Sequence, residues 1–140
     1  MEAKEYLGQI KKLDTLIENK LRLMKDLRDS TQQVTAAPKD VAVKSTARLD
    51  RLEEAICKIV DLEKAIANDI EKLAKIKNEI IATIDKLDNA DMIEILYRKY
   101  VHLEDWVKIV DEMCLSEQSI YRLHGIALAK VNAILKNESK

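Results

Sequence analysis

The chain has 140 residues, of which 47% are hydrophobic and 35% charged, with two glycines, one proline, no phenylalanine and a formal net charge of −1. This composition is typical of a soluble α-helical protein, and no apolar run is long enough to span a membrane. The first residues, Met1 to Lys4, contain neither a signal-peptide core nor a myristoylation glycine, so we expect a cytoplasmic protein.

The first predicted element is a helix over about residues 2–29. Its apolar residues alternate at steps of three and four, which is the heptad spacing of a coiled coil. The predicted core positions of this helix are Ile10, Leu13 and Ile17, followed by Met24 and Leu27. Lys20 interrupts this core track. The segment 30–46 contains Pro38 and sustains no helical stripe, so it is predicted to be a loop, with Thr46 as a cap for the next helix.

A second, longer helix is predicted over about residues 47–87, on the order of 60 Å in length. Its predicted coiled-coil core comprises Ile56, Ile59, Ile66, Ile70, Leu73, Ile80 and Ile84. Folding back on the first helix would form an antiparallel coiled-coil hairpin over residues 1–87. That hairpin leaves the end of the long helix without cover, so either a second subunit or the C-terminal helices must bury it. Glu63 and Lys77 lie on the core track, and charged residues there favour a defined homodimer.

A break follows at Leu87–Met92, where Asp88 or Asn89 can cap a helix that carries Ile93, Leu96, Tyr97 and Tyr100. Residues 88–140 are therefore predicted to form a separate three-helix domain. The predicted fold class is all-α, with a long coiled-coil hairpin followed by this smaller domain.

Two apolar stripes in the second half of this domain have the order of a helix-turn-helix. The first stripe comprises Trp106, Ile109, Val110 and Met113, and the second comprises Ile120, Leu123, Ala127 and Val131, with Leu128 beside it. Cys114 and Leu115 leave room only for a tight turn between them. Ser116 is placed to cap the second helix by accepting from a backbone N–H two or three residues further on.

The start of the second helix of this motif would supply the residues that meet double-stranded DNA. N-terminal residues of such a helix reach base edges in the major groove. The candidate DNA-binding residues are Ser116, Glu117, Gln118, Tyr121, Arg122 and His124. Gln118 suits adenine and Arg122 suits guanine, while Ser116, Tyr121 and His124 suit backbone or flanking contacts. Two amphipathic helices joined by a tight turn also occur in many helical domains that never contact DNA.

Residues 93–131 resemble region 4 of bacterial sigma factors. IEILYRKY corresponds to the helix ahead of the motif, DWVKIVDEMCLS to the first motif helix and turn, and EQSIYRLHGIALAKV to the recognition helix. The whole chain is similar to small phage and prophage proteins of Gram-positive bacteria, related to the ArpU-type late transcription regulators. This resemblance also covers AKEYLGQIKKLDTLIENKL and KIVDLEKAIANDIEKLAKIKNEIIATIDKL. It implies a phage-encoded transcription regulator that acts in the bacterial cytoplasm.

The chain departs from the pattern of these relatives at three positions. Cys114 stands where many relatives have a turn glycine, Val110 where a small residue is common, and Ile126 where arginine is frequent. From Asp88 onward the chain has seven Lys and Arg against nine Asp and Glu, a net charge of −2. Because DNA-binding surfaces owe much of their affinity to phosphate neutralisation, this charge favours modest affinity and a dimer that reads two half-sites.

Catalysis is not expected, because the sequence has no Gly-rich phosphate loop, no nucleophile elbow and no convergent set of His, Cys and carboxylate residues. Cys57, Cys114, His102 and His124 lack the spacing of a disulfide framework or a zinc site, so no metal or cofactor is expected. The leading prediction is a dimeric DNA-binding transcription regulator. The same fold could instead bind RNA polymerase or a sigma factor, or the chain could be a coiled-coil adaptor or inhibitor without DNA binding.

Overall fold

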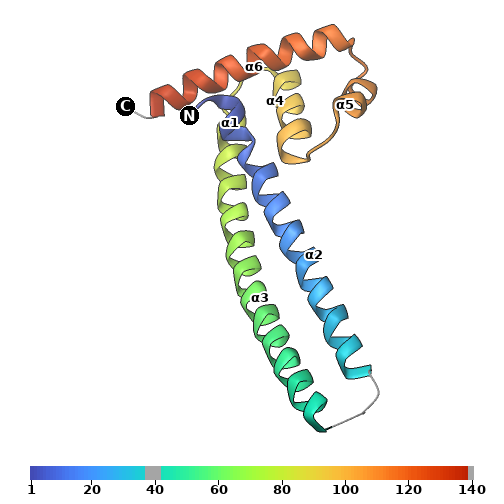
Figure 1. Cartoon of the computed structure of the whole chain (residues 1–140). Helices are drawn as coiled ribbons and strands as arrows, with labels where there is room; N and C mark the ends of the chain where they lie inside the picture. The colour runs from blue at the N-terminus through green and yellow to red at the C-terminus, as the bar shows by residue number, and fades with distance from the viewer. Residues whose placement is uncertain (37–41, 139–140) are drawn as a thin grey trace. The chain divides into compact units, whose positions relative to one another are not determined.

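The computed structural model describes residues 1–36 and 42–138, with the side chains of 33–36 and 42–45 left out (Figure 1). The protein is all-α, and the described residues contain no strand. The elements are α1 (Ala3–Leu7), α2 (Gln9–Ala36), α3 (Ala42–Ile84), α4 (Ala90–Leu96), the π-helical turn η1 (Tyr97–Val101), α5 (Trp106–Met113) and α6 (Glu117–Glu138). None of the described helices combines the length and the apolarity needed to cross a membrane.

The chain divides into two compact units. The head unit comprises Met1–Asp14 and Leu73–Lys140, and the arm unit comprises Thr15–Lys72. This division differs from the predicted boundary at residue 87. The reason is that the first residues and the end of α3 share a buried core with α4 and α6.

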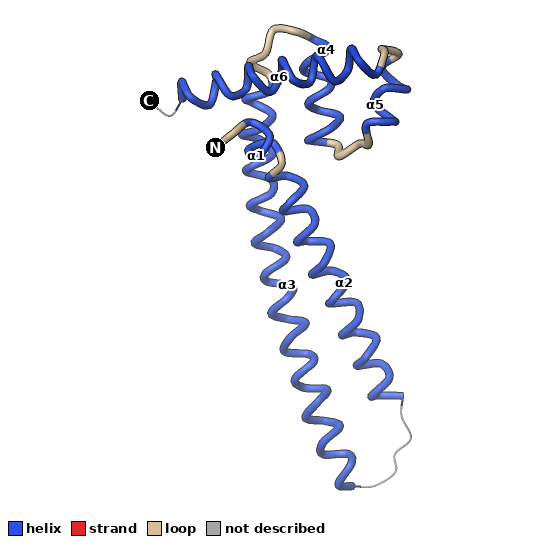
Figure 2. Tube along the Cα trace, turned by 45° about the horizontal axis from the view of Figure 1, so that its top comes forward, coloured by secondary structure: helices blue, strands red, loops and turns tan. Residues whose placement is uncertain are grey.

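In the arm unit, α2 and α3 lie side by side in both views (Figures 1 and 2). Among the described residues of the arm unit, the buried apolar side chains are those of Ile17, Met24 and Ile66. Lys20, which interrupts the apolar track of α2, donates to Asp69 Oδ2 of α3 at 2.5 Å. The lysine on the core track therefore has a carboxylate partner on the facing helix.

The predicted coiled-coil core is buried at some positions and exposed at others. Ile10, Ile17, Ile66, Ile80 and Ile84 are buried, and Leu13, Ile59 and Leu73 are half-buried. Ile56 and Ile70 are 49% and 52% exposed in the single chain, so the hairpin alone does not bury them. Successive helix positions are separated by about 100°. Ile56 is three residues from Ile59, and Ile70 is four residues from Ile66. Each is therefore rotated by about 60° or 40° around α3 from a more buried residue, toward the edge of the apolar face.

The helix boundaries also differ from prediction. The first predicted helix is divided at Gly8, where a Cβ atom would lie only 3.0 Å from the carbonyl oxygen of Lys4. α2 continues to Ala36 and α3 begins at Ala42, so the predicted loop over 30–46 was too long. Extending a formed helix adds one hydrogen bond for each residue ordered, which favours helix even through these polar residues. Thr46 lies inside α3 rather than at its start, and Pro38 lies outside the described residues.

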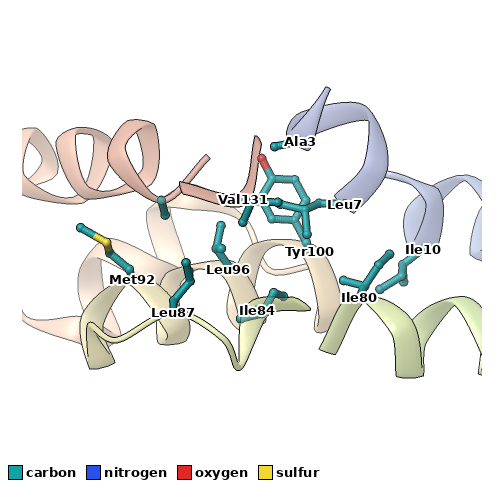
Figure 3. Close-up of a cluster of buried hydrophobic side chains, with 11 residues drawn as sticks. Ala3, Leu7, Ile10, Ile80, Ile84, Leu87, Met92, Leu96, Tyr100 and Val131 are labelled. Carbon is teal, nitrogen blue, oxygen red and sulfur yellow. The ribbon is translucent and has the colours of Figure 1, made fainter. Parts of the chain in front are cut away.

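The core of the head unit joins residues from both ends of the chain (Figure 3). Its buried members are Ala3, Leu7, Ile10, Ile80, Ile84, Leu87, Met92, Leu96, Tyr100, Ala127 and Val131. Two polar contacts accompany this packing. The backbone N–H of Ala3 donates to Asn132 Oδ1 at 2.6 Å, and the hydroxyls of Tyr6 and Thr83 are 3.1 Å apart.

α4 begins at the predicted break in the chain. Asn89 caps it by accepting from the backbone N–H of Met92 at 3.0 Å, which confirms one of the two predicted caps. A second, smaller cluster buries Ile95 of α4 with Ile109 of α5 and Ile120 of α6. This cluster joins the two helices of the predicted motif to α4.

Candidate nucleic-acid interface

The turn between α5 and α6 is tight, as the spacing of the two apolar stripes predicts. Cys114 ends α5 in the left-handed conformation, with φ 56° and ψ 31°. Ser116 Oγ then accepts from the backbone N–H of Ser119 at 3.1 Å and donates to Ser119 Oγ at 2.8 Å. The predicted Ser116 cap is therefore confirmed. The loop drawn between the two helices in Figure 2 corresponds to this turn.

Replacing Cys114 with glycine is expected to stabilise the head unit. The left-handed conformation costs a residue with a Cβ atom roughly 1 to 2 kcal/mol, and greater freedom of glycine in the unfolded chain offsets part of the gain. We expect a net increase of about 1 kcal/mol in the free energy of unfolding, measured in urea by the fluorescence of Trp106. Cys114→Ala is the control and should change little. A Cys114→Gly variant less stable than the native chain would contradict the strain at this turn.

The first two turns of α6 present a polar surface. Ser116, Glu117, Gln118 and Arg122 are exposed, and Tyr121 is 45% exposed. The buried residues Ile120, Ala127 and Val131 hold the opposite side of α6 against the rest of the head unit. Five of the six predicted DNA contacts are thus accessible from solvent.

His124, the sixth predicted contact, is a packing residue. Its Nε2 lies 2.7 Å from the hydroxyl oxygen of Tyr100, and its ring stacks on Tyr100 at 5.8 Å between centroids. The edge-to-face contact with Trp106, 4.7 Å between centroids, covers it further. Burial lowers the pKa of His124 below its usual value, and the positive charges of Lys4 and Lys99 lower it further. We therefore leave His124 out of the candidate interface.

A contact between aromatic rings and a lysine beside α6 was not predicted from the sequence. Trp106 meets Tyr121 edge to face at 5.3 Å between centroids, and Lys99 Nζ lies 4.9 Å from the Trp106 ring centroid. Such a cation–π contact holds the lysine side chain over the ring. Lys99 and Trp106 are seven residues apart and separated by a loop, so no helical periodicity predicts that they meet.

Ion pairs of Arg98 connect η1 to α5. The Arg98 guanidinium reaches Glu94 at 3.1 Å and Glu104 at 3.2 Å, and it also pairs with Glu112 of α5. The Arg98 side chain is only 22% exposed. These carboxylates raise the pKa of Arg98, mainly through the hydrogen bond to Glu112. The arginine therefore neutralises part of the acidic charge of the head unit and positions α5.

An apolar hollow also lies on the surface of α5 and α6. It has a volume of about 180 Å³ and is lined by Trp106, Val107, Val110, Glu117 and Tyr121. Val107 is 84% exposed, although it is an aliphatic residue in the first turn of α5. An exposed apolar side chain beside a hollow is a feature of protein-binding surfaces.

Cys57 and Cys114 are both free and exposed. Within residues 1–36 and 42–138, no three His, Cys, Asp or Glu side chains are grouped so that they could hold a metal ion. Comparisons of the chain with protein-family models, curated proteins and solved structures find no match. The resemblance to sigma-factor region 4 and ArpU-type regulators therefore remains a prediction from the sequence motifs.

Proposed function

We propose that this protein is a DNA-binding transcription regulator that uses α5, the Cys114–Ser116 turn and α6 as a helix-turn-helix. The observation that carries the proposal is the capped start of α6, from which Gln118, Tyr121 and Arg122 are exposed. N-terminal residues of a recognition helix are those that reach base edges in the major groove. The sequence resemblance extends the proposal to a phage-encoded regulator related to the ArpU type.

Each exposed side chain has a role in this proposal that follows from its chemistry. The Arg122 guanidinium has two donors in the geometry that suits O6 and N7 of guanine, and the Gln118 amide suits N6 and N7 of adenine. The Tyr121 hydroxyl can donate to a phosphate oxygen, whereas the Ser116 hydroxyl donates to Ser119 Oγ and so fixes the start of α6. Glu117 can accept from the amino group of cytosine, and its negative charge suits the positive end of the α6 dipole.

The proposed regulator acts as a homodimer that binds two half-sites. The single chain leaves large apolar side chains exposed on the arm unit at Leu16, Leu21, Leu23, Leu49, Ile56, Val60 and Ile70. Burying them against a second copy would remove this apolar area from water. Sedimentation of the native chain should give the mass of a dimer, and Ile56→Lys with Ile70→Lys should give a monomer.

Arg122→Ala is expected to weaken binding to a specific duplex by about tenfold to a hundredfold, because a bidentate contact with guanine contributes about 1 to 3 kcal/mol of discrimination. The duplex would be selected from a random-sequence pool with the native protein, and band-shift titrations would be run at two salt concentrations. Arg22→Ala is the matched control, since Arg22 is an exposed residue of the arm unit. Absence of native binding at low salt, or equal affinities of the Arg122 variant and the native chain, would refute direct readout.

A second candidate function is supported by the exposed Val107 and the apolar hollow beside it. In this alternative, the same surface binds a protein such as RNA polymerase or a sigma factor. Val107→Lys should then abolish binding to purified polymerase holoenzyme in a surface-plasmon titration. If the protein is instead a DNA-binding regulator, Val107→Lys should retain DNA binding, because the substitution adds a positive charge.

A further inference from the structure

Three lysines of the head unit converge from two distant parts of the chain. Lys11 and Lys99 line one cavity of about 130 Å³, together with Gly8, Tyr100, Leu103 and Asp105. Lys4 lies in α1 one turn before Gly8, whose backbone N–H donates to the Lys4 carbonyl oxygen at 3.0 Å, and Lys11 lies in the first turn of α2. The positive charges of Lys4 and Lys99 both lower the pKa of His124, so both lysines act on the same part of the head unit.

Within the part of the chain that the structure describes, these lysines have no carboxylate partner. Among the described residues, no ion pair involves Lys4, Lys11 or Lys99, although most of the charged residues around η1 and α5 are paired. Asp105 is the one carboxylate that lines the cavity, and it is not within ion-pair distance of a lysine. Lys11 and Lys99 against Asp105 give the lining of the cavity a net charge of +1 in an otherwise slightly acidic protein.

One residue that lines the cavity has an unusual backbone. Leu103 has φ 57°, a left-handed conformation that is costly for leucine. Residues with such strained backbones are concentrated at binding sites.

We infer that Lys4, Lys11 and Lys99 form a binding site for the phosphates of a nucleic-acid backbone. The inference rests on the proposed DNA-binding function, and it places sequence-independent contacts beside the recognition helix. Trp106 provides the link, because its ring contacts both Lys99 and the candidate DNA residue Tyr121. The site would supply the phosphate neutralisation that α6 lacks, since Arg122 and Lys130 are its only basic residues before Lys136.

The first test measures phosphate binding without DNA. Trp106 is the only tryptophan of the chain, so its fluorescence reports on the lysine that lies over its ring. Inorganic tripolyphosphate should change this fluorescence saturably in the native chain, beyond the effect of sodium chloride at equal ionic strength. The change should be absent from Lys4→Gln/Lys11→Gln/Lys99→Gln. It should persist in Lys25→Gln/Lys64→Gln/Lys72→Gln, which removes the same charge from exposed positions of the arm unit.

The second test measures the salt dependence of binding to duplex DNA by fluorescence anisotropy. Removing three phosphate contacts should lower the slope of log affinity against log salt concentration by about 2 to 3, with an affinity loss at low salt of about tenfold or more for every sequence. Lys4→Gln/Lys11→Gln leaves Lys99 over Trp106 and should lower the slope by about 2. Far-UV circular dichroism would verify that each variant folds.

The two tests separate the two proposals. A native chain that binds tripolyphosphate but no DNA would refute the proposed function and keep the anion site. A native chain that binds DNA, with the slope unchanged in both lysine variants and no response to tripolyphosphate, would overturn the site and keep the proposed function.

Discussion

Leu7→Ala is expected to lower the free energy of unfolding of the head unit by about 3 kcal/mol, within the range of about 2 to 5 kcal/mol observed for buried leucines. Leu7 is fully buried in the five-residue helix α1. It belongs to the cluster that contains Ile84, Tyr100 and Val131, so truncation leaves a cavity where three other segments meet (Figure 3). Unfolding in urea, followed by Trp106 fluorescence, measures the head unit.

The matched control for this prediction is Leu21→Ala, because Leu21 lies on α2 and is 45% exposed. It should cost less than about 1 kcal/mol, since less apolar area returns to water. A fragment of residues 88–140 provides a second comparison. It lacks Leu7, Ile10, Ile80 and Ile84, so we expect it to be unfolded or only partly ordered by circular dichroism. A cooperatively folded fragment, or equal effects of the two leucine variants, would contradict a core shared by both ends of the chain.

Asp69→Ala is expected to destabilise the arm unit by about 1 to 2 kcal/mol, because it leaves Lys20 without its partner. The Asp69 side chain is 13% exposed and the Lys20 side chain is 32% exposed, so solvent screens the pair only in part. Replacing both residues with leucine is expected to restore the stability or raise it above that of the native chain, because apolar residues of similar volume often replace a buried ion pair without loss. Urea unfolding followed by far-UV circular dichroism measures the effect.

Arg28 and Glu63 provide the control for this cycle. They join the same two helices at 3.1 Å, but both side chains are more than half exposed, so Glu63→Ala should cost less than about 1 kcal/mol. If Asp69→Ala and Glu63→Ala have equal effects, the burial of the Lys20 pair does not contribute to stability. If the double leucine variant is less stable than Asp69→Ala, the pair contributes more than its partial burial indicates.

The apolar hollow and the lysine site indicate different kinds of binding partner for the head unit. Val107 and the hollow favour a protein partner, whereas the unpaired lysines favour phosphate groups. Trp106 borders the hollow and also contacts Lys99, so both features adjoin the same residue. Measurements on Val107→Lys and on the lysine variants would therefore show which type of partner this surface binds.

Features that depend on neighbours within one or two helical turns could be predicted from the sequence. Periodicity predicted the apolar faces of α5 and α6, and Ile109, Ile120, Ala127 and Val131 are fully buried. The caps at Asn89 and Ser116 were predicted because a cap bonds a backbone group three residues away. The left-handed backbone of Cys114 was one of two possibilities that the sequence left open at this turn.

Which segments of the chain meet could not be predicted from the sequence and is seen in the folded structure. An apolar stripe shows that a helix face must be buried, but its partner depends on packing between residues far apart in the chain. For this reason the sequence did not reveal that Leu7 shares a core with Val131, or that α2 leaves Ile56 exposed. The same reason applies to the charges. Lys11 is separated from Lys99 by 88 residues, and only folding brings both to one cavity.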